Sequence, residues 1–207
     1  MTIEYWNPKW YFWDSFSDEQ IKQSKEIIDP LLDDESFWGE QPEWSKFCMM
    51  TASTTQRGED NYLVSKWLDV LRPTFQKFLD EMSWKCEVDI KPDGLWINKY
   101  NKHEHQEFHN HSMPSCNLSM VYFHRCEGDD FNFFDTEWQF NRANGLHDVV
   151  ELPNFEILTP ENTQHKVIIF PSQYGHFVSP NKSDSRRVTV SGNFKVMKRE
   201  YTMRDIL

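Results

Sequence analysis

The sequence predicts a mainly β (α+β) protein: an antiparallel sandwich or jelly roll, with helices from the N-terminal third packed on its outer sheet. Hydrophobic residues recur at steps of three and four up to about residue 82, and from residue 84 they lie in short alternating segments separated by turn residues. No helical pattern lies between these segments, which favours antiparallel strands over parallel βαβ units. We therefore expect a single domain over 1–207, with a helical cover at 1–83 and a β core at 84–207.

The composition limits both the size of the fold and the kinds of partner. The 207 residues are enough for one domain, and aromatic residues, at 15%, supply large buried surfaces. A net charge of −11 argues against general nucleic-acid binding, and the lack of a run of about 18 apolar residues argues against a membrane span. The N-terminus lacks a signal-peptide pattern and the four cysteines show no short paired spacing, so we expect a cytoplasmic protein.

Two helices are expected in the N-terminal third. Ser17 and Gln20 have the spacing of a capping box, so a helix should begin there and end close to Pro30. A second helix is expected over 60–82, where hydrophobic residues recur with helical spacing, and Pro73 should kink or split it. Both hydrophobic faces are best explained as surfaces that pack on the sheet.

The strands of the β core are short. KPDG at 91–94 predicts a turn, and LWINKY at 95–100 predicts a strand with Trp96, Asn98 and Tyr100 on one face. Further strands are expected over 117–124, 131–134, 166–171, 176–180 and 187–196. The long polar segment 136–164 has the character of a lid or a binding loop.

Four of the eight histidines lie in the nine-residue stretch HEHQEFHNH, which ends at His111. Residues two apart share one face of a strand, so His109 and His111 can bind one metal ion from the same side. The pairs His103 and His105, and His105 and Glu107, have the same spacing, and spacing alone does not choose among them. The stretch therefore indicates a metal site without defining its ligands.

A second group of polar residues lies near the C-terminal end of the β core. His176 ends FPSQYGH, after a strand and a turn, and Arg187 begins a later alternating strand with Thr189 on the same face. A guanidinium beside a hydroxyl can hold a carboxylate, because the guanidinium donates two parallel hydrogen bonds. Arg186 should point to the opposite face, so we do not expect the two arginines to be equivalent.

Residues from about 93 to 196 resemble the 2-oxoglutarate- and Fe(II)-dependent oxygenases of marine bacteria and phages, which are relatives of the prolyl hydroxylases. The resemblance rests on LWINKY, FHNHSMPSCNLSMVYF, FNFFD and VIIFPSQYGHFVSPNKSDSRRVTVSGNF. It implies a double-stranded β-helix (jelly roll, cupin-like) core and an enzyme, a dioxygenase that uses iron, 2-oxoglutarate and O2. Such an enzyme hydroxylates a substrate, here an unknown peptide or small molecule, while 2-oxoglutarate is decarboxylated to succinate. A phage-encoded protein would act in the host cytoplasm.

The same resemblance assigns the metal ligands. His109 matches the first iron ligand of the family and His176 the last, whereas His111 stands where the family usually has a carboxylate. The implied site therefore has three histidines in place of the two-histidine, one-carboxylate set. Taking His105 and Glu107 as ligands would keep a carboxylate, but their spacing to the following strand fits the family less well.

The resemblance also assigns the co-substrate site. Arg187 matches the residue that binds the distal carboxylate of 2-oxoglutarate, with Thr189 assisting, and Tyr100 matches a tyrosine that contacts the co-substrate. A second tyrosine of the family is replaced here by Phe123, and Ser119 on the same strand face is the alternative source of a polar contact.

A second class of function is compatible with the histidines. A cupin-like domain with a three-histidine metal site and no 2-oxoglutarate would be another dioxygenase, an isomerase or a non-catalytic binding module. The cupin pattern normally adds a glutamate shortly after its HxH, and none follows His111 closely in HSMPSCNL. Because that class also leaves Arg187 without a role, we favour the oxygenase.

Overall fold

The computed structural model describes residues 9–38, 49–50, 62–128, 130–138, 143, 145, 156–161 and 163–200. The helices are α1 (Asp18–Ile28) and α2 (Tyr62–Glu81), and two 3-10 turns, η1 (Asp29–Leu31) and η2 (Glu35–Phe37), follow α1. The strands are β1 (Phe12–Ser15), β2 (Met49–Met50), β3 (Val88–Tyr100), β4 (Gln106–His109), β5 (Leu118–Arg125), β6 (Phe131–Phe134), β7 (Ile157–Leu158), β8 (Lys166–Pro171), β9 (His176–Val178) and β10 (Arg187–Lys198). Most of the predicted loop at 136–164 lies outside the described residues.

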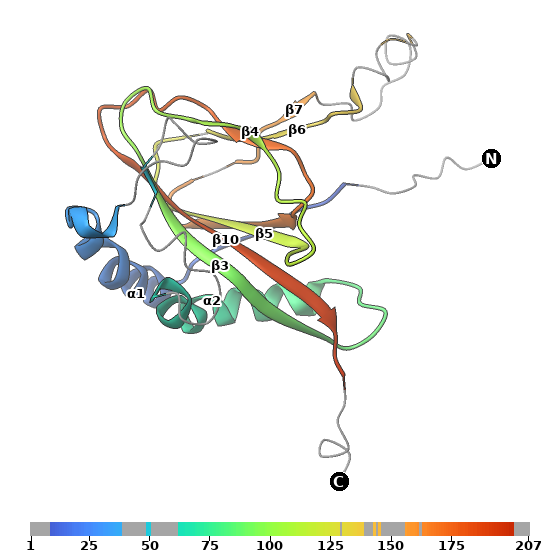
Figure 1. The fold of residues 1–207 in the computed structure, drawn as a ribbon. Helices are drawn as coiled ribbons and strands as arrows, with labels where there is room; N and C mark the ends of the chain where they lie inside the picture. Colours follow the sequence, from blue (N-terminus) through green and yellow to red (C-terminus); the bar gives the residue numbers. More distant parts are fainter. Residues whose placement is uncertain are drawn as a thin grey trace.

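The strands form two antiparallel sheets that face each other (Figure 1). The larger sheet has the order β1-β8-β5-β10-β3-β2 and the smaller sheet the order β4-β9-β6-β7. The two helices cover the outer face of the larger sheet (Figure 1). The predicted mainly β jelly roll with helices on its outer sheet is therefore confirmed.

Local signals set most of the helix boundaries. The Ser17 side chain accepts from the Gln20 backbone and the Gln20 side chain accepts from the Ser17 backbone, so the predicted capping box begins α1. Pro30 lies in η1, directly after α1 ends. The expectation that Pro73 could split the second helix is wrong, because α2 runs through it without a break. Its buried face continues on both sides of Pro73, and this packing outweighs one missing backbone hydrogen bond.

Two short strands lie in the N-terminal third, so the predicted cover at 1–83 is not purely helical. Strand β1 pairs with β8 at one edge of the larger sheet, and β2 pairs with β3 at the other edge. Strand β1 lies in an aromatic-rich segment whose four residues are too few for a clear alternating pattern. It forms because β8 offers backbone groups that would otherwise be an open sheet edge.

The predicted turn at 91–94 is also wrong. Strand β3 continues through this segment, and the register with β10 moves from Asn193 opposite Gly94 to Phe194 opposite Pro92. Asp93 is therefore the extra residue of a β-bulge. The long pairing with β10 on both sides absorbs the turn-forming residues into the strand.

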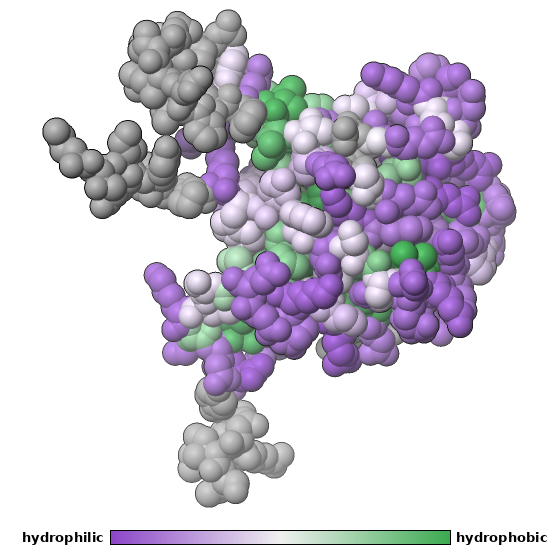
Figure 2. Space-filling view, turned by 180° about the vertical axis from the view of Figure 1, so that it is seen from behind, coloured by the Kyte–Doolittle hydropathy of each residue, from purple (hydrophilic) through white to green (hydrophobic). Residues whose placement is uncertain are grey.

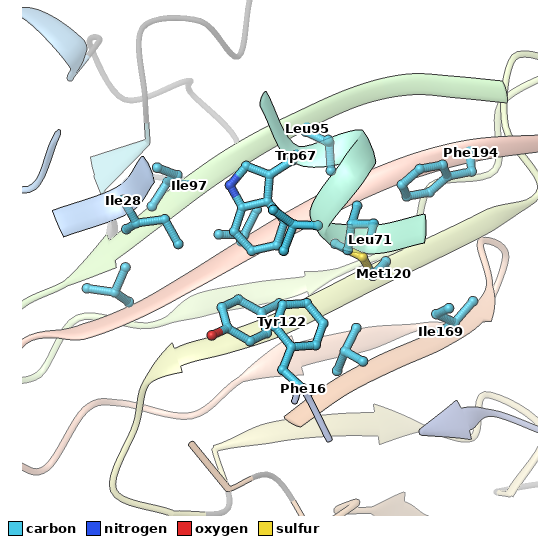
Figure 3. Packing of buried hydrophobic residues seen from close by; sticks show 14 of the residues in the cluster. Phe16, Ile28, Trp67, Leu71, Leu95, Ile97, Met120, Tyr122, Ile169 and Phe194 are labelled. Atoms are coloured by element: carbon cyan, nitrogen blue, oxygen red, sulfur yellow. The ribbon is translucent and has the colours of Figure 1, made fainter. Parts of the chain in front are cut away.

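The main hydrophobic core lies between the larger sheet and the helices. Trp67 of α2 is fully buried, and its ring centroid lies 5.3 Å from that of Tyr122 of β5 (Figure 3). Phe16 stacks on Tyr122 at 4.2 Å between centroids, and Leu95 and Ile97 of β3 complete this part of the core. These contacts fix the outer face of the sheet.

The inner face of the larger sheet is more polar. Trp96, Asn98 and Tyr100 alternate with the core residues of β3 and line a pocket between the two sheets, as the pattern of LWINKY predicts. A smaller aromatic cluster around Phe131 and Phe170 fills the rest of the space. Burying polar groups between the sheets of a sandwich costs free energy unless they are paired, so their presence here indicates a functional site.

The face shown in Figure 2 is covered mostly by hydrophilic residues, with hydrophobic residues in small separate areas. Among the described residues, the large hydrophobic side chains that are exposed are Trp13, Leu68, Phe108, Ile157 and Met197. No described helix combines the length and the hydrophobicity that a membrane span requires.

Candidate metal centre

Three histidines meet in the pocket between the sheets. His109 ends β4 and His176 begins β9, and the two are partners across the antiparallel pair. His111 lies two residues beyond β4, where its backbone N–H donates to the Ser172 carbonyl at 2.8 Å. One ring nitrogen from each of the three lies within 4.8 Å of the others, and no other such group of histidine, cysteine or acidic residues occurs in the described part of the chain.

The predicted convergence is therefore present, although one of its reasons needs correction. Strand β4 ends at His109, so His111 does not owe its position to alternation along a strand. It reaches the other two rings because the extended segment after β4 is tied to the residue that follows β8. The alternative pair, His105 and Glu107, is not part of the cluster.

Backbone carbonyls orient two of the rings. His109 Nδ1 lies 2.7 Å from the Glu107 carbonyl oxygen, and His176 Nδ1 lies 2.8 Å from the Tyr174 carbonyl oxygen. A carbonyl only accepts, so Nδ1 is the protonated nitrogen in both rings and Nε2 keeps its lone pair. This is the second-shell arrangement that prepares a histidine to bind a metal through Nε2.

The third ring is held by side chains. His111 Nδ1 lies 3.5 Å from the Asn193 side-chain nitrogen, and the Asn193 oxygen accepts from the Ser119 hydroxyl at 2.9 Å. The Trp96 ring lies 5.9 Å from the His111 ring, between centroids. Ser119 thus holds Asn193, which in turn contacts the His111 ring, and Ser119 also lines the pocket.

The surroundings keep the three imidazoles neutral. Burial lowers the pKa of His109 below its usual value and lowers the pKa of His111 to about 4. Burial also holds the pKa of His176 well below its usual value. Only the neutral ring has a free lone pair, so the site favours the form that binds metal. Three neutral nitrogen ligands fit Fe(II), and they also fit Zn, Cu or Ni.

Arg187 lies in the same pocket. It is 3% exposed, its Nη2 donates to the Ser179 carbonyl at 2.9 Å, and its guanidinium lies 4.5 Å from the Tyr100 ring centroid. Its Nη1 lies 2.6 Å from Asp130 Oδ2. Arg186 points elsewhere and pairs with Asp33 on the surface, so the predicted difference between the two arginines is confirmed.

The other predicted residues, Tyr100, Ser119 and Thr189, line this pocket too. All seven predicted site residues are therefore found there: His109, His111, His176, Tyr100, Ser119, Arg187 and Thr189. Thr189 is buried, and its hydroxyl accepts from the Asn98 side chain at 3.3 Å. Asp130 and Asn193 also belong to the surroundings of the site, although the sequence did not indicate them. Asn193 lies in the alternating segment of β10, whereas no local signal distinguishes Asp130 from neighbouring acidic residues.

A cluster of metal-binding side chains between two facing antiparallel sheets, with a buried arginine beside it, defines the class of double-stranded β-helix metalloproteins. Within that class, residues 94–193 match the family model described as "Putative 2OG-Fe(II) oxygenase". This segment contains every residue that lines the pocket, and it belongs to the 2OG-Fe(II) oxygenase family. No curated protein sequence matches the chain.

Solved structures share the fold at low sequence identity. An oxidoreductase of the 2OG-Fe(II) oxygenase family from Burkholderia pseudomallei is 14% identical with a TM-score of 0.59, over 89% of this chain and 84% of that one. A Pseudomonas putida prolyl-4-hydroxylase is 12% identical with a TM-score of 0.57, over 92% and 94%. A Trichoplax adhaerens prolyl hydroxylase in complex with a peptide fragment is 7% identical with a TM-score of 0.59, over 89% and 82%. The predicted double-stranded β-helix is confirmed.

Proposed function

We propose that this protein is a 2-oxoglutarate- and Fe(II)-dependent oxygenase that hydroxylates a peptide or a small molecule in the cytoplasm. His109, His111 and His176 hold the iron, and Arg187, Thr189 and Tyr100 hold the distal carboxylate of 2-oxoglutarate. The observation on which the proposal depends is the buried guanidinium in the same pocket as three convergent histidines. The substrate class stays open between a peptide and a small molecule.

The iron, when bound with 2-oxoglutarate and O2, supplies the oxidising power, and the residues of the chain do the rest. His109, His111 and His176 would hold the metal through three neutral ring nitrogens. Arg187 offers a fixed cation for the distal carboxylate, and Tyr100 supports that cation from its ring face. The buried aromatic wall around Phe131 and Phe170 limits water near the reacting atoms.

The three-histidine set changes the charge of the centre. A site with one carboxylate ligand neutralises part of the metal's charge, whereas three neutral imidazoles leave the full charge of the cation facing the pocket. We expect this to strengthen the attraction for the anionic end of 2-oxoglutarate that meets the metal. The same ligand set also suits a cupin-like protein without 2-oxoglutarate, in which the Arg187–Asp130 pair would be permanent.

Isothermal titration of the Mn(II)-loaded protein with 2-oxoglutarate separates these two functions. We expect Arg187→Ala to weaken 2-oxoglutarate binding by roughly 30-fold or more, because truncating one partner of a shielded charged pair costs about 2–5 kcal/mol. Arg187→Ala should leave Mn(II) binding nearly unchanged. Arg186→Ala is the matched control and should have little effect on either ligand, since its side chain pairs with Asp33 on the surface.

Equal and small effects of the two arginine substitutions would favour the cupin-like alternative. A direct test of catalysis is the conversion of 2-oxoglutarate to succinate with Fe(II) and O2. His176→Ala should abolish this conversion together with Mn(II) binding.

A further inference from the structure

A carboxylate of the protein itself lies against the cation that the proposed function gives to the co-substrate. Asp130 comes just before β6, lines the pocket, and places Oδ2 at 2.6 Å from Arg187 Nη1. The contact has the length of an ion pair but not the direction of a hydrogen bond, since Nη1 has no hydrogen-bond acceptor in line among the described residues. The buried Nε of Arg187 also lacks a hydrogen-bond partner in that part of the chain.

This geometry leaves the guanidinium only partly satisfied. Nη2 donates to the Ser179 carbonyl at 2.9 Å and to the Glu104 carbonyl at 3.5 Å, while Nη1 and Nε are the nitrogens still able to donate to a better-aligned acceptor. A carboxylate oxygen that lies in line with an N–H of Nη1 would form a stronger, charge-assisted hydrogen bond than the misdirected contact with Asp130. The Asp130 contact is therefore suited to exchange for an incoming carboxylate.

The Asp130 side chain reaches solvent although its backbone is held in place. Its backbone is fixed, because its carbonyl accepts from the Ser179 N–H at 2.7 Å and from the Asn132 side chain at 2.9 Å. Its side chain, however, is 25% exposed, against 2% for the side chain of Arg187. A rotation about the side-chain bonds can carry the carboxylate toward solvent while the arginine stays in place.

The pocket around this pair is narrow in the present arrangement, with a cavity volume of about 30 Å³. A buried arginine without a counter-charge is costly, so a side chain that balances it before the co-substrate arrives is useful. The same side chain then has to leave the guanidinium, because two carboxylates at one cation repel each other.

We propose that Asp130 is a built-in competitor for the distal carboxylate of 2-oxoglutarate, which it releases from Arg187 only to a ligand that brings a carboxylate of its own. This rests on the proposed function, since it takes Arg187 as the co-substrate clamp. Asp130 thereby sets the affinity for the co-substrate. A ligand that lacks the second carboxylate leaves the Asp130–Arg187 pair in place, so its affinity does not depend on Asp130.

The test is a titration of Mn(II)-loaded wild-type and Asp130→Asn proteins with two ligands. One is 2-oxoglutarate and the other is 2-oxopentanoate, which has the same chain length and a methyl group in place of the distal carboxylate. We expect Asp130→Asn to bind 2-oxoglutarate roughly three- to tenfold more tightly, the range that removal of a partly exposed competing ion pair allows. Binding of 2-oxopentanoate should not change.

Asp33→Asn is the matched control, because it removes the partner of the neighbouring Arg186 on the other face, and it should change neither affinity. Asp130→Asn could be less stable than the wild-type protein without ligand, and thermal unfolding covers that case. The rise in Tm that 2-oxoglutarate produces should be larger in the variant than in the wild-type protein.

Weaker or unchanged 2-oxoglutarate binding by Asp130→Asn would mean that Asp130 positions Arg187, and would overturn the proposal. Equal tightening for both ligands would overturn it as well. If the wild-type protein binds 2-oxoglutarate no better than Arg187→Ala does, the clamp itself is wrong and the proposed function fails first.

Discussion

At the scale of single residues, Ser119, Asn193 and His111 link two strands of the larger sheet to the metal centre. The Ser119 hydroxyl of β5 donates a hydrogen bond to the Asn193 side chain of β10, and that side chain faces Nδ1 of His111. If His111 binds metal through Nε2, as the other two rings are arranged to do, its Nδ1 carries a proton and needs an acceptor. The Asn193 amide, turned by half a rotation, presents its oxygen to that proton and its nitrogen to Ser119.

This arrangement predicts that Asn193 supports metal binding without touching the metal. Asn193→Ala should weaken Mn(II) binding by about tenfold or more, the lower end of the usual effect of losing a second-shell partner. Asn193→Asp should restore binding, because a carboxylate also accepts from Nδ1–H. Equilibrium dialysis or titration with Mn(II) measures both. An alanine variant with wild-type affinity would show that the backbone of the His111 segment is sufficient.

His124 makes the stability of the protein depend on pH. Burial lowers its pKa, although the Asp29 carboxylate, 2.9 Å from Nε2, acts in the opposite direction. The unfolded chain therefore takes up this proton at a higher pH than the folded protein does. The contribution of neutral His124 to the free energy of unfolding is complete above the pKa of about 6.5 that the residue has in the unfolded chain. As the pH falls from there toward the pKa in the folded protein, this contribution is lost by at most about 1.4 kcal/mol per pH unit.

We accordingly expect His124→Gln to reduce the loss of unfolding free energy between pH 7 and pH 5. Urea unfolding of the metal-free protein at several pH values measures the slope. His103→Asn is a suitable control, because this histidine is exposed and has a positive φ of 70° that asparagine tolerates. Identical slopes for His124→Gln and the wild-type protein would contradict the prediction.

At the scale of the elements, β10 is the strand on which the site depends most. It pairs with β3 on one side and β5 on the other, places Arg187 and Thr189 in the pocket, and brings Asn193 to His111. On its outer face, a Cβ added at Gly192 would collide with the Leu95 side chain. Leu95 is fully buried under the helices, so its side chain could move only by repacking the core around it. This glycine lets β10 lie close to the core of the larger sheet.

Gly192→Ala should therefore destabilise the protein by roughly 1–3 kcal/mol, as overpacking of a core does. Gly94→Ala is the matched control. Gly94 lies on the neighbouring strand, opposite Asn193, and a Cβ there meets nothing within 4 Å. Chemical unfolding of the two variants gives the comparison. Equal stabilities would mean that Leu95 repacks at little cost.

At the scale of the whole molecule, the helices and the sheets share one core. Trp67 of α2 has no exposed surface and lies among residues of β3, β5 and the segment after β1. The 94–193 segment that defines the family therefore depends on residues before it to bury the outer face of its larger sheet. We propose on this ground that the chain folds as a single domain.

Trp67→Ala should lower the free energy of unfolding by about 3–5 kcal/mol, because it removes a fully buried aromatic side chain. Its neighbour on the same helix, Leu68, is 39% exposed, so Leu68→Ala should have a much smaller effect. In a single domain, helix content and tryptophan fluorescence should be lost in the same transition in every variant. Two separate transitions would show that α1 and α2 fold independently of the sheets.

Several features could be predicted from the sequence because they depend on local order along the chain. The change of hydrophobic period near residue 84, the two faces of LWINKY and the capping box at Ser17 each involve residues a few positions apart. His109, His176 and Arg187 could be selected by their resemblance to a family pattern. These signals are sufficient for the fold class and for the outline of the site.

Only the tertiary structure determines which residues that are distant along the chain become neighbours in space. The register of β10 between β3 and β5 brings Asn193 to His111 and turns 91–94 from a turn into a bulge. The pairing of β1 with β8 makes a strand of an aromatic segment that has no clear pattern of its own. Asp130 meets Arg187 only because β6 and β10 lie on opposite walls of the same pocket. The physical reason is that a strand's partners satisfy its backbone and surround its side chains, and which strand becomes the partner is a property of the assembled sheets.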